Sequence, residues 1–326
     1  MISVIIPIHN AENTLKNCLD SIILQNFEYQ IEIVCIDDAS TDNSREIVKS
    51  YIKKRPNIQL IGTNKNIGSG KARNLGLRKA TGDYILFCDA DDLYPPYAFD
   101  VLYRSIKKSN SDFAVGNIKF MNSTMQHVLS LPDRDAAMVI GEEKVVSPRD
   151  YPPLWKPAFH QRFLFKKEFL IRNNIVYPNF LRGQDPPMLA RVLCCAKQAS
   201  VVPHIVYIYR VSAGKLNSAK KINDSFKAFK MTIDIFRKYN CNKQADIHIV
   251  HGAQIDCNIS FYRYSKKQRR DIISLYNYLF STITTKDFSP YIGGVNKKDF
   301  FIIKSNIFMY ILKKIIKKIK NYWIDK

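Results

Sequence analysis

Short apolar runs alternate with segments of helical periodicity along the N-terminal third of the chain. The runs are residues 2–8, 31–36, 58–61 and 84–88. After the first run, apolar residues recur at the spacing of one helix face, which predicts a helix over residues 13–24. Strands that alternate with helices favour an α/β fold with a mostly parallel central sheet.

Polar clusters follow the end of each predicted strand. They occupy residues 8–10, 37–42, 64–70 and 89–92. The carboxyl ends of the strands in an open parallel sheet share one edge, and ligands bind in the crevice outside that edge. The sequence therefore predicts that four distant segments meet around one crevice large enough for a nucleotide.

The fourth cluster is the tetrad Asp89-Ala90-Asp91-Asp92. Carboxylates this close repel one another unless a cation or hydrogen bonds offset the repulsion. Oxygen ligands suit Mg²⁺ or Mn²⁺, which keep coordination positions for water and for the phosphates of a nucleotide. The tetrad is thus a candidate metal site, and the alternative is a solvated turn before Pro95-Pro96, where Asp is common for local reasons.

The composition describes a globular protein with a preference for anionic partners. With 326 residues, of which 46% are hydrophobic, the chain can bury a large core. Fifty Lys and Arg against 29 Asp and Glu give a net charge of +21, which favours nucleotides, anionic lipid surfaces or nucleic acid. Composition alone does not choose among these three partners.

Cysteine usage and hydropathy are typical of a cytoplasmic protein. The seven cysteines are odd in number, form no C-x-x-C pair and mostly interrupt apolar segments, as reduced core residues do. The N-terminus lacks the pattern of a signal peptide. No apolar run reaches the ~18 residues that a membrane span needs. We therefore expect the protein to remain in the cytoplasm.

Three common cofactor motifs are absent from the sequence. Gly68, Gly70 and Gly76 do not have the G-x-G-x-x-G spacing, and Gly70-Lys71 lacks the upstream glycine of a P-loop. The six histidines show no metal-ligand spacing with cysteine. Binding of NAD, Walker-type binding of ATP and a zinc site are therefore not expected.

The character of the chain changes near residue 215, where we expect a domain boundary. Residues 1–215 form the predicted α/β domain, and residues 216–326 are predicted to be amphipathic helices. The last segment, 297–326, carries nine Lys against two Asp, isoleucines at helical spacing, and Tyr322-Trp323 near its end. Such a helix can lie on an anionic membrane surface, and the alternative is a terminal helix that packs its apolar stripe on the second domain.

Four motifs, taken in order, resemble the family 2 glycosyltransferases. They are residues 4–10 (VIIPIHN), 36–42 (IDDASTD), 64–76 (NKNIGSGKARNLG) and 87–92 (FCDADD). A looser similarity to the acceptor half of bacterial members extends through Trp155-Lys156, residues 165–169, residues 174–178 and Gln184-Asp185. The resemblance implies a GT-A fold with a nucleotide-sugar half at 1–115, an acceptor half at 116–215 and a C-terminal helical extension.

The resemblance assigns donor binding to residues from all four motifs. Asp38 matches the family's uracil-binding aspartate, and a carboxylate can accept a hydrogen bond from the imide N–H of a pyrimidine. Arg73 would neutralise phosphate or orient the acidic motif, unless it is an ordinary surface residue of its helix. Pro7, Ile8 and His9 would pack against the base and ribose. The full donor set is Pro7, Ile8, His9, Asn10, Asp38, Asn66, Gly68, Arg73, Asp89, Ala90 and Asp91.

The tetrad matches the family's D-x-D motif, whose carboxylates bind the ribose and a metal that bridges the diphosphate. By position, Asp89 faces the ribose and Asp91 the metal, and both are candidate ligands of Mn²⁺ or Mg²⁺. Asp92 would support them. The metal would stabilise the departing nucleoside diphosphate, whose charge grows in the transition state.

An inverting transfer also needs a general base that takes the proton of the acceptor hydroxyl. Asp185 matches the aspartate of the family's Glu-Asp motif, although Gln184 stands where the glutamate is usual. This departure keeps the base but leaves the local charge and the pKa of Asp185 open. The alternative is that Asp185 caps the helix that starts at Pro186-Pro187.

Three residues are weaker candidates on the acceptor side: Trp155, Gln184 and Arg210. Trp155 could stack on a sugar ring, and a core tryptophan is the alternative. Arg210 ends a strand that resembles the family's aromatic-Arg strand end, where a histidine often follows, but Ser212 stands there instead. This departure weakens the case for a diphosphate role of Arg210.

Together these observations predict a metal-dependent, inverting glycosyltransferase. It would move a sugar from a nucleotide donor, with UDP the expected carrier, to a glycan or lipid-linked acceptor in bacterial surface polysaccharide assembly. The C-terminal tail would hold it at the inner face of the cell membrane. The alternative is a non-catalytic GT-A-like or basic module that binds anionic lipid or nucleic acid, although carboxyl-rich loops in one crevice would repel a polyanion such as nucleic acid.

Overall fold

The computed structural model describes residues 1–130, 139–211 and 219–255, with ten further positions between 270 and 284. Contacts between Cα atoms divide the chain into two compact units. The first unit extends to Thr232, and the second begins at Ile233. The predicted boundary near 215 falls among residues 212–218, outside the described residues, and stays a prediction.

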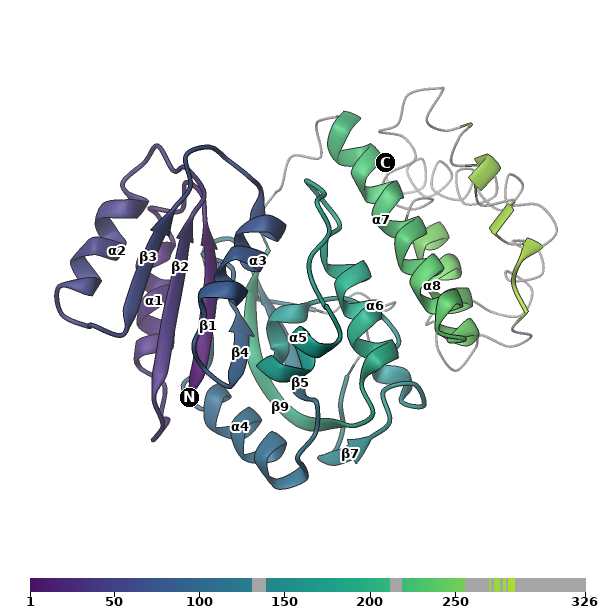
Figure 1. Cartoon of the computed structure of the whole chain (residues 1–326), viewed down its shortest axis with the longest axis horizontal. Coiled ribbons are helices and arrows are strands. Elements are labelled where there is room, and N and C mark those ends of the chain that lie inside the picture. Colours follow the sequence, from purple (N-terminus) through teal and green to yellow (C-terminus); the bar gives the residue numbers. More distant parts are fainter. Residues whose placement is uncertain are drawn as a thin grey trace, which may run out of the picture. The chain divides into compact units, whose positions relative to one another are not determined.

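The N-terminal half of the first unit is a series of β-α repeats (Figure 1). Each strand lies within one residue of its predicted range, because each apolar run is bounded by polar or turn-forming residues. The elements are β1 (Ile2–Ile8), α1 (Leu15–Ile23), β2 (Ile31–Asp37), α2 (Ser44–Ile52), β3 (Ile58–Gly62), α3 (Ser69–Lys79), β4 (Tyr84–Phe87) and α4 (Ala98–Ser109).

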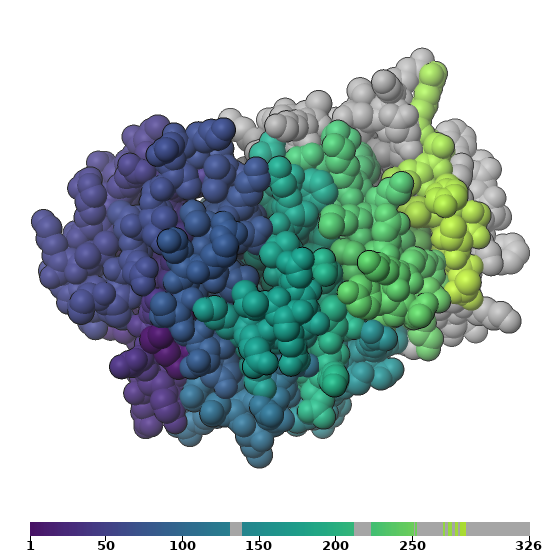
Figure 2. Space-filling model, in the orientation of Figure 1, coloured from purple at the N-terminus to yellow at the C-terminus, as the bar shows by residue number. Residues whose placement is uncertain are grey.

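The C-terminal half of the first unit adds shorter and less regular elements. Its strands are β5 (Phe113–Met121), β6 (Val128–Leu129), β7 (Lys144–Val146), β8 (Phe163–Lys166) and β9 (Ala199–Arg210). Its helices are α5 (Lys167–Arg172) and α6 (Asp185–Cys195), with single 3-10 turns at Pro152–Leu154 and His160–Arg162. Side chains of this unit pack into one continuous body in the space-filling view, from purple at the N-terminus to teal near residue 200 (Figure 2).

One mixed sheet runs through the first unit in the order β3-β2-β1-β4-β8-β5-β9-β7, with β6 paired to β5. The strands β3, β2, β1 and β4 are parallel, as the β-α pattern predicts. β8 pairs antiparallel with both β4 and β5, whereas β9 returns parallel to β5. The carboxyl ends of β1 to β4 therefore share one edge.

Helices cover both faces of the parallel strands. Alternate residues of β1, from Ile2 to Ile8, join the core cluster that also contains buried residues of α1 and α4. Ile5 faces the other side, where α3 packs so closely that a Cβ at Gly76 would lie 2.3 Å from Ile5 Cγ2. Only glycine allows this approach of helix to strand. The two packed faces explain why β1 is apolar at every position but Ser3, whose buried hydroxyl donates to Glu32.

The described part of the second unit is helical, as predicted for this region. α7 (Ala219–Lys238) ends in it and α8 (Asn242–Ile255) follows, and an ion pair joins Arg237 to the buried Asp246. The basic segment 297–326 lies outside the described residues, so its membrane role stays a prediction. Among the helices that the structure describes, none is long and apolar enough to cross a membrane.

Candidate active site

A cavity of about 510 Å³ lies at the shared strand edge. The loops after β1 and β4 and the first turn of α3 line it, as expected for segments that follow parallel strands. Its lining is Pro7, His9, Asn10, Ala11, Asn13, Thr14, Ser69, Arg73, Asp89, Ala90 and Asp91. Seven residues of the predicted donor set are thus brought together around one space.

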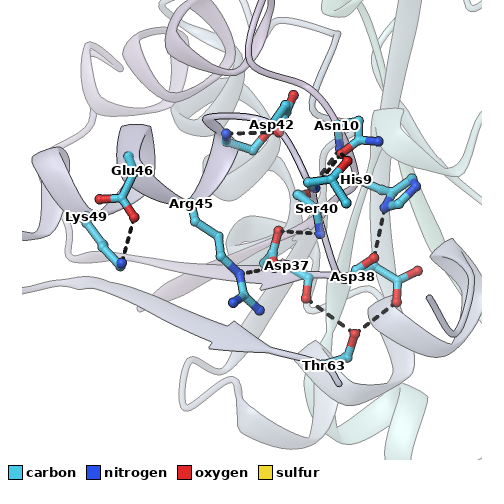
Figure 3. Close-up of polar contacts among 12 residues, drawn as sticks. His9, Asn10, Asp37, Asp38, Ser40, Asp42, Arg45, Glu46, Lys49 and Thr63 are labelled. Atoms are coloured by element: carbon cyan, nitrogen blue, oxygen red, sulfur yellow. Dashed lines mark hydrogen bonds and ion pairs between the residues drawn. The ribbon is translucent and has the colours of Figure 1, made fainter. Parts of the chain in front are cut away.

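The loop of residues 37–42 makes polar contacts with residues of the loop after β1 (Figure 3). The Asn10 side-chain oxygen accepts a hydrogen bond from the Thr41 N–H at 2.8 Å, and the Glu12 N–H donates to Asp42 Oδ2 at 2.9 Å. Asn10 has φ of 52°, a conformation that Asn adopts more readily than most residues. These bonds fix the loop after β1 to the loop after β2.

Asp38 is buried and uses its carboxylate to hold the turn before α3. Oδ1 accepts from the Ile67 N–H at 2.7 Å and from Thr63 Oγ1 at 3.1 Å, while Oδ2 accepts from the Gly68 N–H at 2.8 Å. A carboxylate offers about four acceptor sites, so one remains for a ligand. Gly68 has φ of 87°, which favours glycine at this turn.

His9 is linked to the same loop through its ring. Its Nδ1 lies 2.8 Å from the carbonyl oxygen of Asp38, and because a carbonyl only accepts, Nδ1 carries the hydrogen. His9 and Asn66 are exposed, whereas Ile8 belongs to the core cluster with 1% of its surface exposed. The expected contact of Ile8 with a base is therefore not supported, and Ile8 supports the edge from inside.

Arg73 is buried, with 4% of its surface exposed, and it orients the acidic tetrad. Its Nη2 donates to Asp89 Oδ1 at 2.5 Å, and the guanidinium carbon lies 5.2 Å from the ring centre of Tyr177. Gln161 Nε2 donates to the other carboxylate oxygen of Asp89 at 2.7 Å. The alternative of an ordinary surface residue is wrong, because Arg73 points inward to two fixed partners.

Asp92 is the structural carboxylate of the tetrad. It is 1% exposed and accepts from the Tyr207 hydroxyl at 2.8 Å and from the Arg210 N–H at 2.7 Å. Burial, together with the charges of Asp89 and Asp91, raises the pKa of Asp92 to about 9. Its contacts agree with the supporting role predicted for it.

Asp91 is the tetrad carboxylate left open toward the cavity. It lines the cavity beside Asp89, and the backbone hydrogen bond that lowers the pKa of its carboxylate comes from Asp91 itself. Burial and the charge of Asp89 raise the pKa of Asp91. An ionised Asp91 is thus destabilised by its surroundings, and a cation beside it would offset that cost.

Asp91 and Asp89 could hold a divalent ion only if a bound substrate supplied further oxygen ligands. No group of three or more His, Cys, Asp or Glu side chains able to hold a metal occurs in the part of the chain that the structure describes. Mg²⁺ and similar ions are often held by one or two carboxylates together with substrate phosphates. The two carboxylates at the cavity wall meet that description.

Asp185 begins α6 and lies next to Arg73. Asn74 clamps the segment before α6 to α3, because its amide donates to the Tyr177 carbonyl at 2.8 Å and accepts from the Tyr177 N–H at 2.9 Å. Asp185 Oδ1 consequently lies 3.8 Å from Arg73 Nη1 and 3.3 Å from His160 Nδ1. One guanidinium therefore contacts both the tetrad and the predicted base.

The surroundings of Asp185 keep it ionised. Burial raises the pKa of its carboxyl, but the neighbouring His160 and Arg73 favour the charged form, and together they lower the pKa to about 2. The N-cap residue of α6 is Gln184, and Asp185 is the first residue of the helix itself. The capping alternative does not describe this carboxylate.

The acceptor-side candidates lie in different settings. Trp155 is 5% exposed, so it belongs to the core, and a sugar ring could not stack on it. Gln184 is also buried and donates to the Phe180 carbonyl at 2.5 Å. Arg210 lies beside the tetrad, where its Nε donates to the Asp91 carbonyl at 2.8 Å and its Nη1 to the Ser123 carbonyl at 2.5 Å.

Four buried residues around the site are not among the candidates from the sequence: His160, Gln161, Tyr177 and Tyr207. Tyr177 and Tyr207 lie in segments that resemble the family, but the resemblance assigns no role to either residue. Tyr207 accepts from the Asp89 N–H at 3.1 Å and donates to Asp92, so it joins two members of the tetrad. Each of the four comes from a segment far from its partner along the chain. Only the alternation of β9 hinted that Tyr207 points toward the sheet core.

Residues 3–128 match the family model described as glycosyl transferase family 2. The chain carries a family 2 glycosyltransferase domain. Among curated proteins, the chain is 30% identical to the poly(ribitol-phosphate) beta-glucosyltransferase of Bacillus spizizenii over 213 residues. The aligned residues make up 64% of this chain and 32% of that protein. The chain is 26% identical to glycosyltransferase GlyG of Streptococcus pneumoniae over 225 residues, and the aligned residues make up 66% of this chain and 72% of that protein.

Solved structures confirm the predicted GT-A fold. S. aureus TarS residues 1–349 in complex with UDP-GlcNAc aligns with a TM-score of 0.77 and 18% identity, over 95% of this chain and 89% of that one. The chain spans about a third of the length of the first curated relative, 32%. At 18% identity, the likeness to the solved structure shows the fold alone, and the donor, acceptor and mechanism are taken up below.

Proposed function

We propose that this glycosyltransferase moves a sugar from a UDP-linked donor to a hydroxyl group of a bacterial surface polymer, with inversion at the anomeric carbon. The observation that carries the proposal is the pair of contacts made by Arg73. Its guanidinium contacts Asp89, in the wall of the donor cavity, and Asp185, at the start of α6. A donor-binding carboxylate and a candidate base are thus held on either side of one buried cation.

A single displacement fits this arrangement. Asp185 takes the proton of the attacking hydroxyl while that oxygen bonds to the anomeric carbon and the UDP oxygen departs. A carboxylate with a pKa of about 2 is a weak base toward a free alcohol. It suffices here because the hydroxyl becomes strongly acidic as its oxygen forms the new bond, so proton transfer accompanies attack.

The donor-binding residues act before this step. The remaining acceptor site of Asp38 would take the imide N–H of uracil, and Pro7 and His9 would contact the nucleoside. Asp91, with Asp89 beside it, would hold a Mn²⁺ or Mg²⁺ ion, which supplies positive charge to the departing diphosphate. Arg210 lies close enough to Asp91 to add its own charge on that side.

The acceptor class is inferred from the relatives. The beta-glucosyltransferase of Bacillus spizizenii is named for poly(ribitol-phosphate), and other relatives are named for succinoglycan and minor teichoic acid biosynthesis. We infer that the acceptor here is a hydroxyl of a cell-surface polymer of this kind. The competing reading, a non-catalytic module for anionic lipid or nucleic acid, predicts no turnover of any donor.

A donor panel tests the proposal. The full chain is incubated with UDP-glucose, UDP-GlcNAc, UDP-galactose and GDP-mannose, each with Mn²⁺, Mg²⁺ or EDTA, and release of nucleoside diphosphate is measured. We expect one UDP-sugar to be turned over, with water as the slow acceptor, and EDTA to abolish the reaction. If no donor is hydrolysed and anionic vesicles are bound, the non-catalytic reading is correct.

A further inference from the structure

His160 is a fully buried histidine whose ring faces the predicted base. It has 0% of its surface exposed, and it is the first residue of the 3-10 turn His160–Arg162, which leads into β8. Its ring packs edge-on against Phe87 and Tyr177, with centroid distances of 5.7 Å and 5.3 Å, and those two rings also contact each other at 5.3 Å. This packing fixes the plane of the imidazole and directs Nδ1 toward Asp185 Oδ1, at 3.3 Å.

Packing alone does not explain a histidine at this position. Neither ring nitrogen of His160 has a hydrogen bond with correct alignment among the described residues. A buried polar atom without a partner costs about 1–3 kcal/mol. Phenylalanine would fill the same space against Phe87 and Tyr177 without that cost. The imidazole must therefore contribute something that a phenyl ring cannot.

The contacts of Asp185 are concentrated on one of its two oxygens. Arg73 Nη1 and His160 Nδ1 both approach Oδ1, which is buried. The Asp185 side chain is nevertheless 31% exposed. Oδ1 does not contribute to that exposure, which leaves Oδ2 as the oxygen with access to a substrate.

We propose that His160 is a positioning residue for the glycosyl transfer, which holds Asp185 through Oδ1 so that Oδ2 faces the acceptor hydroxyl. This inference rests on the proposed function. In the step concerned, the acceptor O–H bond breaks and Oδ2 gains the proton. The acceptor oxygen bonds to the anomeric carbon. The bond between that carbon and the UDP oxygen breaks, and its electrons leave with UDP. His160 itself touches neither reactant.

The test compares two histidine-to-phenylalanine variants of the full chain. The His160→Phe variant removes both ring nitrogens but keeps the aromatic packing, and His204→Phe changes an exposed histidine of β9 as the matched control. Each is assayed with the donor of highest turnover from the panel. We expect kcat in His160→Phe to fall about 10- to 100-fold, with KM for the donor and the thermal midpoint nearly unchanged.

The pH profile supplies a readout that a purely structural role would not move. Asp185 faces His160, Arg73 of α3, and the phenols of Tyr177 and Tyr209. Removing the imidazole removes one of the two groups that hold the pKa of Asp185 low. The acid limb of kcat in His160→Phe should therefore move to higher pH than in the wild type, and His204→Phe should not shift it.

Wild-type kinetics in His160→Phe, with an unchanged acid limb, would overturn the positioning role. The His160→Gln variant offers an amide donor on the same side, so partial recovery of kcat relative to His160→Phe supports the role. Equal loss in both, together with lost UDP binding, would instead indicate a folding role and contradict it. If the wild type hydrolyses no donor, the proposed function fails first, independently of His160.

Discussion

At the scale of single residues, the tetrad shows how similar side chains acquire different tasks. Asp92 is enclosed by Tyr207 and Arg210, and Asp89 is held by Arg73 and Gln161, whereas the Asp91 carboxylate faces the cavity. The D-x-D motif identifies the cluster, but only the surrounding contacts separate structural from ligand-binding oxygens. Those contacts favour Asp91 as the principal metal ligand.

Replacing Asp91 should lower metal-stimulated turnover of the donor without lowering the stability of the fold. In the Asp91→Asn variant, we expect metal-stimulated turnover of the donor to fall about 100-fold or more, because charge stabilisation of the leaving diphosphate is lost. The thermal midpoint should stay level or rise, since repulsion between Asp89 and Asp91 is relieved. Turnover is measured against Mn²⁺ concentration, with the exposed Asp83→Asn as control. Unchanged stimulation by Mn²⁺ would exclude Asp91 as a ligand.

At the scale of elements, the periodicity of apolar residues predicts β1 to β4 and the helices between them. β2 pairs with β1 and β3 with β2 across one helix each, whereas β4 pairs with the other side of β1 after three helices. The β-α repeat nevertheless predicts that all four strands run parallel. The convergence of their loops follows from the same rule, and it gathers most of the donor candidates.

The rest of the sheet and site could not be predicted, because it depends on distant pairings. β8 inserts antiparallel between β4 and β5, and β9 joins β5 from more than seventy residues away. His160 and Gln161 sit just before β8, so their contacts with Asp185 and Asp89 follow from that insertion. Neither residue has a spacing that relates it to its partner along the chain.

The contact of α3 with β1 yields a prediction about stability. The Gly76→Ala variant places a methyl group 2.3 Å from Ile5 Cγ2, and both elements are fixed by the core. We expect a loss of about 1–3 kcal/mol in the free energy of unfolding, even though alanine favours a helix by about 1 kcal/mol over glycine. Denaturant titration measures it.

The Gly141→Ala variant is the control for this prediction, because a Cβ there has nothing within 4 Å. Its free energy of unfolding should stay within about 0.5 kcal/mol of the wild type. If Gly76→Ala proves as stable as Gly141→Ala, the packing of α3 on β1 described above is incorrect.

At the scale of the whole molecule, charge and site complement each other. A net charge of +21 attracts an anionic donor, while the cavity wall carries Asp89 and Asp91. A diphosphate bound alone would face those carboxylates, so the balance favours binding together with a cation. Under the proposed function, the protein would draw in a nucleotide sugar together with its metal and would discriminate against polyanions that bring no metal.

The central claim is that Asp185 takes the proton of the acceptor hydroxyl but does not take part in binding the donor. The direct measurement is a comparison of the Asp185→Asn variant with wild type and with Asp83→Asn, using donor turnover together with calorimetric binding of UDP and Mn²⁺. We predict turnover reduced by about 1,000-fold or more, with a dissociation constant for UDP within about threefold of wild type. Retained turnover, or parallel loss of turnover and UDP binding, would contradict the account.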